Sequence, residues 1–385
     1  MSFTAADIRA VPLGLYIHWP WCVRKCPYCD FNSHALGRTD NESRYVDALL
    51  ADLDASAGLD AGRPLRSVFI GGGTPNLMTP AAVERLLEGI SKRFTLAGDC
   101  EITMEANPGA AEADRFGSFR ALGVNRISLG VQSFSDERLA RLGRIHKVAD
   151  VLAAVDEVAR YFDDFNLDMM FALPGQTLED LDAELSRLVS MGSSHLSCYQ
   201  LTIEEGTAFA RRLPEGLPDD DMLADMADLV HERLTSAGFE HYEVSGYAKP
   251  GWRCVHNLNY WTFGDYLAAG AGAHGKHTTA DGVFRTVRES SPARYMTLAE
   301  EGAVVETRRV ETEDLPFEYM LNALRLTEGF DLADFEVRTG LPAALIRNRL
   351  DSLSGKGLLV LDGGWVCLTP LGRAFLSDVQ EAFLD

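Results

Sequence analysis

The sequence GLYIHWPWCVRKCPYCDF, residues 14–31, begins with an apolar run and ends with three closely spaced cysteines. The run 14–19 is typical of a β-strand, and the cysteines follow it in a loop. Cys22, Cys26 and Cys29 can each hold one iron of a cubane cluster, and the fourth iron then stays open to a small molecule. A closed zinc site, the main alternative, needs four ligands, and no second cysteine pair exists elsewhere. We therefore expect a [4Fe–4S] cluster on these three thiolates.

Strand-like apolar runs alternate with amphipathic stretches from residue 14 to about residue 202. The predicted strands are 14–19, 67–70, 101–106, 126–131, 165–171 and 195–201. The predicted helices between them include 45–53, 81–94, 152–161 and 178–191. Six successive strand–helix units indicate a parallel α/β fold, either a partial barrel or an open, doubly wound sheet. In both folds, ligands bind at the carboxyl ends of the strands, where the cysteines lie.

The pattern changes after the sixth unit. A helix over 221–237 and a strand over 240–246 are predicted, and the Gly- and aromatic-rich segment 247–281 is expected to be irregular. Farther on, helical patterns precede two short apolar runs joined by Asp362-Gly363-Gly364, which is typical of a hairpin. We divide the chain into a core over 1–250, a connecting segment over 251–305 and a small winged-helix-like domain over 306–385.

The composition limits the partners and the compartment. The net charge is -21, and residues 306–385 carry 8 Lys and Arg against 14 Asp and Glu, so the C-terminal domain is not expected to bind nucleic acid. Clustering of three of the seven cysteines favours metal binding over disulfides. No apolar run approaches the ~20 residues of a membrane helix, and the first residues lack a secretory signal. We expect a cytoplasmic protein.

The C-x3-C-x2-C spacing resembles the radical SAM superfamily, in which the amino and carboxylate groups of S-adenosylmethionine (SAM) chelate the open iron. The motifs GGGTP, EANP and GVQSF, which begin at Gly71, Glu105 and Gly130, also match that family and follow or end three successive predicted strands. The resemblance implies a partial (β/α)6 barrel. It also implies SAM contacts for Tyr16, Tyr28, Gly72, Gly73, Thr74, Glu105, Gln132, Arg144 and Asp168.

Over its whole length the chain resembles the family that contains oxygen-independent coproporphyrinogen III dehydrogenase and the HemW-type haem chaperones. The decarboxylating enzyme has a fourth cysteine where this chain has Phe31, and it has a longer segment before the cysteine loop. Both departures argue against dehydrogenase activity, and we place Phe31 in the cofactor site. The sequence His256-Asn257-Leu258-Asn259-Tyr260-Trp261 resembles the chaperones' HNxxYW signature.

Imidazole is a common axial ligand of haem iron, and aromatic rings pack against a flat macrocycle. The resemblance implies haem as cargo, with His256 as the predicted ligand and His274 as a second candidate. The structural alternative is a loop whose His and aromatic side chains pack onto the barrel mouth. We expect a haem chaperone that delivers haem to apo-haemoproteins such as respiratory enzymes, and coproporphyrinogen III decarboxylation is the alternative. The sequence leaves contact with membrane-bound partners and a homodimer open.

Overall fold

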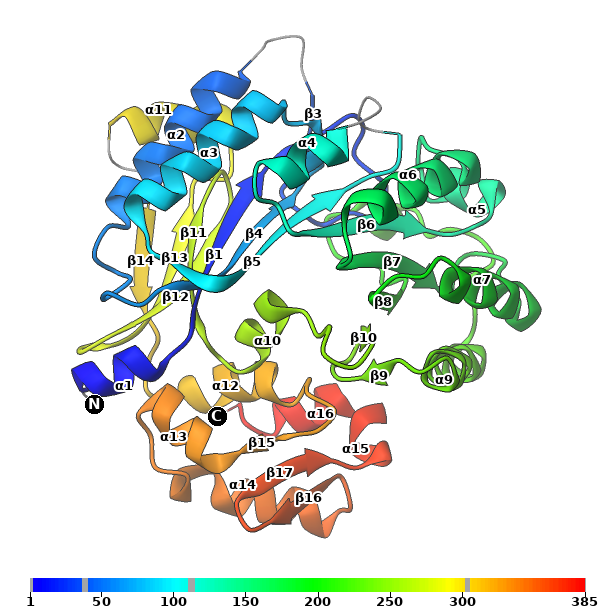
Figure 1. Cartoon of the computed structure of the whole chain (residues 1–385). Coiled ribbons are helices and arrows are strands. Elements are labelled where there is room, and N and C mark those ends of the chain that lie inside the picture. The colour runs from blue at the N-terminus through cyan, green and yellow to red at the C-terminus, as the bar shows by residue number, and fades with distance from the viewer. Residues whose placement is uncertain (1–2, 37–40, 110–114, 302–304, 385) are drawn as a thin grey trace.

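The structure is a computed structural model that describes residues 3–36, 41–109, 115–301 and 305–384. A twelve-stranded sheet curves through most of the chain, and a small second domain packs beneath it (Figure 1). The strand order in the large sheet is β14-β13-β12-β11-β1-β4-β5-β6-β7-β8-β10-β9. None of the helices in the described ranges is long and apolar enough to cross a membrane.

Six adjacent parallel strands form the centre of this sheet. They are β1 (Leu13–Trp19), β4 (Leu65–Gly72), β5 (Leu96–Ala106), β6 (Arg126–Gln132), β7 (Phe165–Phe171) and β8 (His195–Gln200). Their connecting helices include α2 (Glu42–Ala55), α3 (Pro80–Arg93), α4 (Arg115–Ala121), α6 (Val148–Tyr161) and α7 (Leu178–Ser190), on the outer face (Figure 1). The predicted α/β class is thus confirmed. Among the described residues the edge strands β14 and β9 do not pair with each other, so the curved sheet is an open, partial barrel (Figure 1).

Local sequence explains where these elements begin and end. The Thr79 side chain caps α3 by accepting from the Ala82 backbone N–H, and Pro80 occupies the first turn, where a missing N–H costs nothing. Thr177 and Asp180 form a reciprocal capping box at the start of α7. Every residue of β6 is buried, because helices cover one face and the barrel interior the other. Helix caps and continuously apolar strands therefore determine where the helices and strands around the site begin and end.

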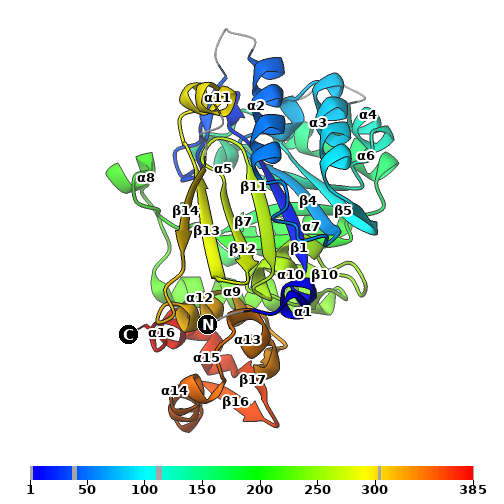
Figure 2. The same cartoon turned by 90° about the vertical axis from the view of Figure 1, so that its left-hand side faces the viewer.

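The segment 247–281 is not irregular, and that prediction was wrong. It contains α10 (Val255–Trp261), β11 (Asp265–Ala269) and β12 (His274–Thr279). β11 pairs in parallel with β1, and β12, β13 (Gly282–Arg288) and β14 (Val305–Arg309) continue the sheet in antiparallel fashion (Figure 2). The expected strand 240–246 is instead split into β9 (Glu240–His241) and β10 (Gly246–Ala248), which pair with each other.

Four of the six residues of β12 are buried, although the strand reads His-Gly-Lys-His-Thr-Thr. This polar sequence does not indicate a buried strand. A buried ion network explains these polar residues. Asp265 is fully buried and accepts from Arg63 Nη1, Lys276 Nζ and Thr278 N at 2.8, 2.8 and 2.9 Å. This network joins β11, β12 and the segment before β4, next to the strand that leads into the cysteine loop.

The C-terminal domain has a second hydrophobic core. Its antiparallel sheet has the order β15-β17-β16, and Gly363 and Gly364 turn the β16–β17 hairpin with φ of 57° and 103°. The predicted hairpin is therefore present. The domain comprises α12 (Leu315–Ala323), β15 (Phe330–Asp331), α13 (Leu332–Thr339), α14 (Ala344–Gly355), β16 (Leu359–Asp362), β17 (Trp365–Leu368), α15 (Pro370–Ala374) and α16 (Leu376–Glu381).

The remaining elements are short, apart from α9. They are α1 (Ala5–Ala10), β2 (Trp21–Cys22), β3 (His34–Ala35), the 3-10 helix η1 (Pro75–Leu77), α5 (Asp136–Arg141), α8 (Ala208–Arg211), α9 (Asp220–Ser236) and α11 (Pro292–Glu300).

Replacing Asp265 by Ala tests the buried ion network. The change leaves Lys276 and Arg63 buried without their carboxylate, which costs about 3–5 kcal/mol when one partner of a buried pair is removed. We expect the free energy of unfolding in urea to fall by about that amount. Asp99→Ala, which breaks the exposed pair with Arg66, is the control and stays within about 0.5 kcal/mol of wild type. Equal losses in the two variants would contradict the network's role.

Candidate cofactor site

Cys22, Cys26 and Cys29 lie in the loop that follows β1. A short parallel ladder between β2 and β3 holds both ends of this loop together. All three thiols are free and half-buried. Burial raises the pKa of the Cys22 and Cys26 thiols, and the nearby Arg144 guanidinium opposes this by favouring their thiolates. The loop therefore presents three thiols that a metal cluster can deprotonate on binding.

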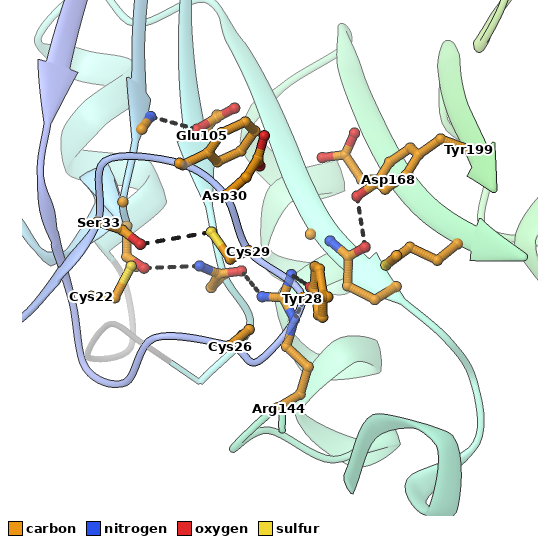
Figure 3. Close-up of a pocket in the computed structure, with 18 of the residues that line it drawn as sticks. Cys22, Cys26, Tyr28, Cys29, Asp30, Ser33, Glu105, Arg144, Asp168 and Tyr199 are labelled. Carbon is orange, nitrogen blue, oxygen red and sulfur yellow. Dashed lines mark hydrogen bonds between the residues drawn. The ribbon is translucent and has the colours of Figure 1, made fainter. Parts of the chain in front are cut away.

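The three thiols line a cavity of about 380 Å³, which we call the cysteine cavity (Figure 3). It lies at the carboxyl ends of the parallel strands, where the fold predicts a ligand. Its volume falls in the ~300–1,000 Å³ range of small-molecule and cofactor sites. The sequence-predicted residues that line it with the cysteines are Tyr28, Phe31, Gly72, Gly73, Thr74, Glu105, Gln132, Arg144 and Asp168.

The glycine loop after β4 lies directly against the cysteine loop. The Gly73 N–H donates to the Trp19 carbonyl at 2.6 Å, and the Thr74 N–H donates to the Trp21 carbonyl at 2.8 Å. A Cβ on Gly73 would lie 2.6 Å from the Trp21 carbonyl oxygen, and Gly72 has a φ of +109°. Glycine is therefore required at both positions, by close backbone approach at one and by backbone conformation at the other.

Arg144 ties the cysteine loop to the end of β5. Its Nε and Nη2 donate to the Tyr28 hydroxyl at 2.9 and 2.6 Å, and its Nη1 donates to Asn107 Oδ1 at 2.6 Å. The Asn107 amide in turn donates to Thr74 Oγ1 at 2.9 Å. Figure 3 shows Tyr28 and Arg144 facing each other at the edge of the cavity. Sequence reasoning missed Asn107, although it belongs to the same EANP motif as Glu105.

Glu105 lies at the end of β5, with its carboxyl group against the glycine loop. Its Oε2 accepts from the Gly72 N–H at 2.9 Å. Burial raises the pKa of Glu105 to about 7, although this hydrogen bond lowers it. A cation placed in the cavity would favour the ionised form, so Glu105 is suited to receive a positively charged group.

The far wall of the cysteine cavity carries hydrogen-bond acceptors. Gln132 has a φ of +66° at a break in the β6–β7 register, and its Oε1 accepts from the Tyr199 hydroxyl at 2.7 Å. Asp168 accepts from the Ser128 hydroxyl at 3.0 Å, and burial raises the pKa of its carboxyl group. Ser128 and Tyr199 also line the cavity. No sequence motif includes these two residues. For Ser128, the alternation of side chains along the strand was the only sequence feature that indicated a position on the cavity face.

A second, larger cavity adjoins the first. We call it the aromatic cavity; its volume is about 680 Å³, and its lining includes Tyr16, Phe31, Phe69, Tyr260, Trp261 and Tyr266. Tyr16 was expected among the SAM contacts, but it lines this second cavity and not the cysteine cavity. Its hydroxyl is 2.7 Å from His18 Nδ1. Phe31 lines both cavities and is 57% exposed, so its ring stands at their junction.

His256, the predicted haem ligand, is buried and lines neither cavity. Its Nδ1 is 2.6 Å from Glu101 Oε1, and its ring stacks on Phe69 with centroids 4.1 Å apart. Burial would raise the pKa of Glu101, but His256 and Arg126 outweigh it and hold that pKa well below its usual range. In this structure His256 therefore fixes α10 against β4 and β5. His256 as a haem ligand stays a prediction.

A parallel α/β partial barrel, with C-x3-C-x2-C after its first central strand and a glycine loop after its second, defines the class of radical SAM proteins. The Radical SAM superfamily matches residues 16–188, and the HemN C-terminal domain family matches residues 310–375. The fold resembles coproporphyrinogen III oxidase (HemN) from Escherichia coli, described as a radical SAM enzyme. The TM-score is 0.82 over 98% of this chain and 91% of that chain, at 24% identity.

Curated relatives identify the family more closely. The chain is 47% identical to heme chaperone HemW of Escherichia coli K12, over 98% of this chain and 99% of that protein. It is 44% identical to heme chaperone HemW of Haemophilus influenzae, over 97% of this chain and 98% of that protein. The chain belongs to the HemW family of radical SAM proteins.

Single cysteine replacements test whether the loop holds a cluster. We expect Cys22→Ala to lose most of the iron and sulfide that wild type retains after anaerobic reconstitution, because a cubane needs all three thiolates here. Cys367→Ala is the control, since Cys367 lies in β17 of the C-terminal domain. Iron and sulfide analysis measures both. Full cluster content in Cys22→Ala, or equal loss in Cys367→Ala, would refute the assignment.

Proposed function

We propose that this protein is a haem carrier that binds haem and delivers it to apo-haemoproteins, among them respiratory enzymes of the membrane. The observation that carries the proposal is full-length similarity to proteins named heme chaperone HemW, which extends to 34% identity in Bacillus subtilis. The aromatic cavity supports it, because aromatic rings can pack against a flat macrocycle.

The radical SAM family implies SAM and a [4Fe–4S] cluster, and the cysteine cavity fits both. Three half-buried thiols converge on it, and Gly72 and Gly73 let a ligand approach the backbone. Cys22, Cys26 and Cys29 would hold three irons. The cluster, when bound, supplies an electron to SAM.

The other lining residues would orient SAM. Glu105 and the glycine loop would bind its amino group, whose N–H groups can donate to the buried carboxylate. Asp168 and Gln132 offer acceptors to its hydroxyl groups, and Tyr28 with Arg144 closes the edge of the cavity.

Oxidation of coproporphyrinogen III is the alternative function. The solved HemN structure shares the fold, at an identity too low to carry the activity over. Phe31 replaces the fourth cysteine that the decarboxylating enzyme carries, and its exposed ring occupies the junction of the two cavities. This substitution favours carriage of haem over its synthesis.

The pH dependence of SAM binding tests the role of Glu105. Its pKa is raised to about 7 without ligand, so below that pH the carboxyl must lose its proton before it can accept, as a carboxylate, a hydrogen bond from the SAM amino group. We expect affinity to rise with pH up to about 7 and then to level off, by calorimetry on the reconstituted protein. Glu105→Gln should bind more weakly and lose this dependence. A wild-type profile as flat as the variant's would contradict the assignment.

Hemin titration tests the function itself. Added to the reconstituted protein, hemin should give a protein-bound Soret band that saturates at about one equivalent. Mixing the loaded protein with a membrane apo-cytochrome should then move that haem to the acceptor. An anaerobic assay for protoporphyrinogen, run on the same sample, distinguishes the alternative. Absence of a bound Soret band would refute the proposed function.

A further inference from the structure

Both the large sheet and the C-terminal domain contribute residues to the lining of the aromatic cavity. Tyr16 and Phe69 come from β1 and β4, Tyr260 and Trp261 from the end of α10, and Asn322 from α12 of the C-terminal domain. Its volume of about 680 Å³ lies within the ~300–1,000 Å³ of cofactor sites. It therefore offers a large compartment with aromatic walls next to the cysteine cavity, and Asn322 of the C-terminal domain borders one side.

Two imidazoles line this compartment, and they differ in their partners. The ring nitrogens of His18 lie 2.7 Å from the Tyr16 hydroxyl and 2.9 Å from the Asn32 carbonyl oxygen, so both are engaged. His274, the first residue of β12, is exposed, and neither of its ring nitrogens has a hydrogen-bond partner among the described residues. Partial burial and the nearby Arg285 and Arg288 lower the pKa of His274, which favours the neutral, iron-binding imidazole.

His274 and Tyr266 also line an adjoining pocket of about 380 Å³ with a basic pair. Arg285 of β13 and Arg308 of β14 are directly opposite each other in the strand register, and both face this pocket. Like charges directly opposite each other are unfavourable unless an anion compensates them. Glu318 pairs with Arg285, and Glu306 also lines the pocket, so Arg308 is the more accessible cation for a ligand carboxylate.

We propose that haem binds with its ring in the aromatic cavity, its iron on His274 and its propionates toward Arg308. This inference rests on the proposed function, because it assigns the site of the same cargo. Haem bound in this way lies against Phe31, whose ring also borders the cysteine cavity. Arginine is suited to bind the propionates, since its planar guanidinium group binds carboxylates with two parallel hydrogen bonds.

Hemin spectra of three histidine variants test the ligand. His274→Ala should lose the wild-type Soret position, and added imidazole should restore it, which a merely structural loss would not allow. His231→Ala, an exposed imidazole on α9, is the control and should keep the wild-type spectrum. His256→Ala should keep the wild-type Soret position, since His256 lines neither the aromatic cavity nor the adjoining pocket. A wild-type spectrum in His274→Ala would overturn the assignment. The assignment would also fail if only His256→Ala lost the wild-type spectrum and added imidazole restored it.

A second pair of variants tests how the protein binds the haem propionates. Arg308→Ala should weaken hemin binding by roughly threefold to tenfold and should leave binding of the hemin dimethyl ester unchanged. Arg309→Ala, on the next residue of β14, is the matched control and should bind hemin as wild type does. Equal affinities of Arg308→Ala and Arg309→Ala would overturn the propionate assignment. Failure of wild type to bind hemin would instead refute the proposed function.

Discussion

The close approach of two loops at the ends of β1 and β4 is the constraint on which the site depends. Backbone hydrogen bonds from Gly73 and Thr74 hold the glycine loop against the carbonyls of Trp19 and Trp21, at 2.6 and 2.8 Å. Any side chain at position 73 would collide with that backbone. This contact fixes the cysteine loop over the carboxyl end of the sheet. A ligand on the cysteines can therefore reach the glycine loop, the Glu105 carboxyl and the acceptors of β6 and β7 at once.

The same contact joins the two cavities. Asp30, Phe31, Gly72 and Glu105 line both of them, so the cofactor and the proposed cargo share one wall. Because that wall includes the exposed ring of Phe31 and a carboxyl group whose pKa is about 7, occupation of one cavity can change the packing and charge in the other. In a haem carrier, this arrangement would couple SAM binding to retention of haem.

The sequence predicted the central fold and the cysteine cavity well, because strong local signals mark them. Alternating apolar strands and helices identified six of the seven adjacent parallel strands. The motifs and the family resemblance named half of the residues that line the cysteine cavity. The strands β11 and β12 were missed, since a buried network around Asp265 allows polar residues such as Lys276 inside the sheet. The burial of His256 and its contact with Glu101, far away in sequence, are invisible in a local motif. Tyr199 was missed because it contacts Gln132 only across the folded barrel.

The iron positions in crystals of the protein loaded with both cluster and hemin show directly whether the cluster and the haem occupy adjoining cavities. Anomalous scattering at the iron edge locates each iron without any assumption about the ligands. We expect one peak beside Cys22, Cys26 and Cys29 and a separate peak beside His274, on the other side of Phe31. A second peak beside His256, or no iron beside the three cysteines, would contradict this assignment.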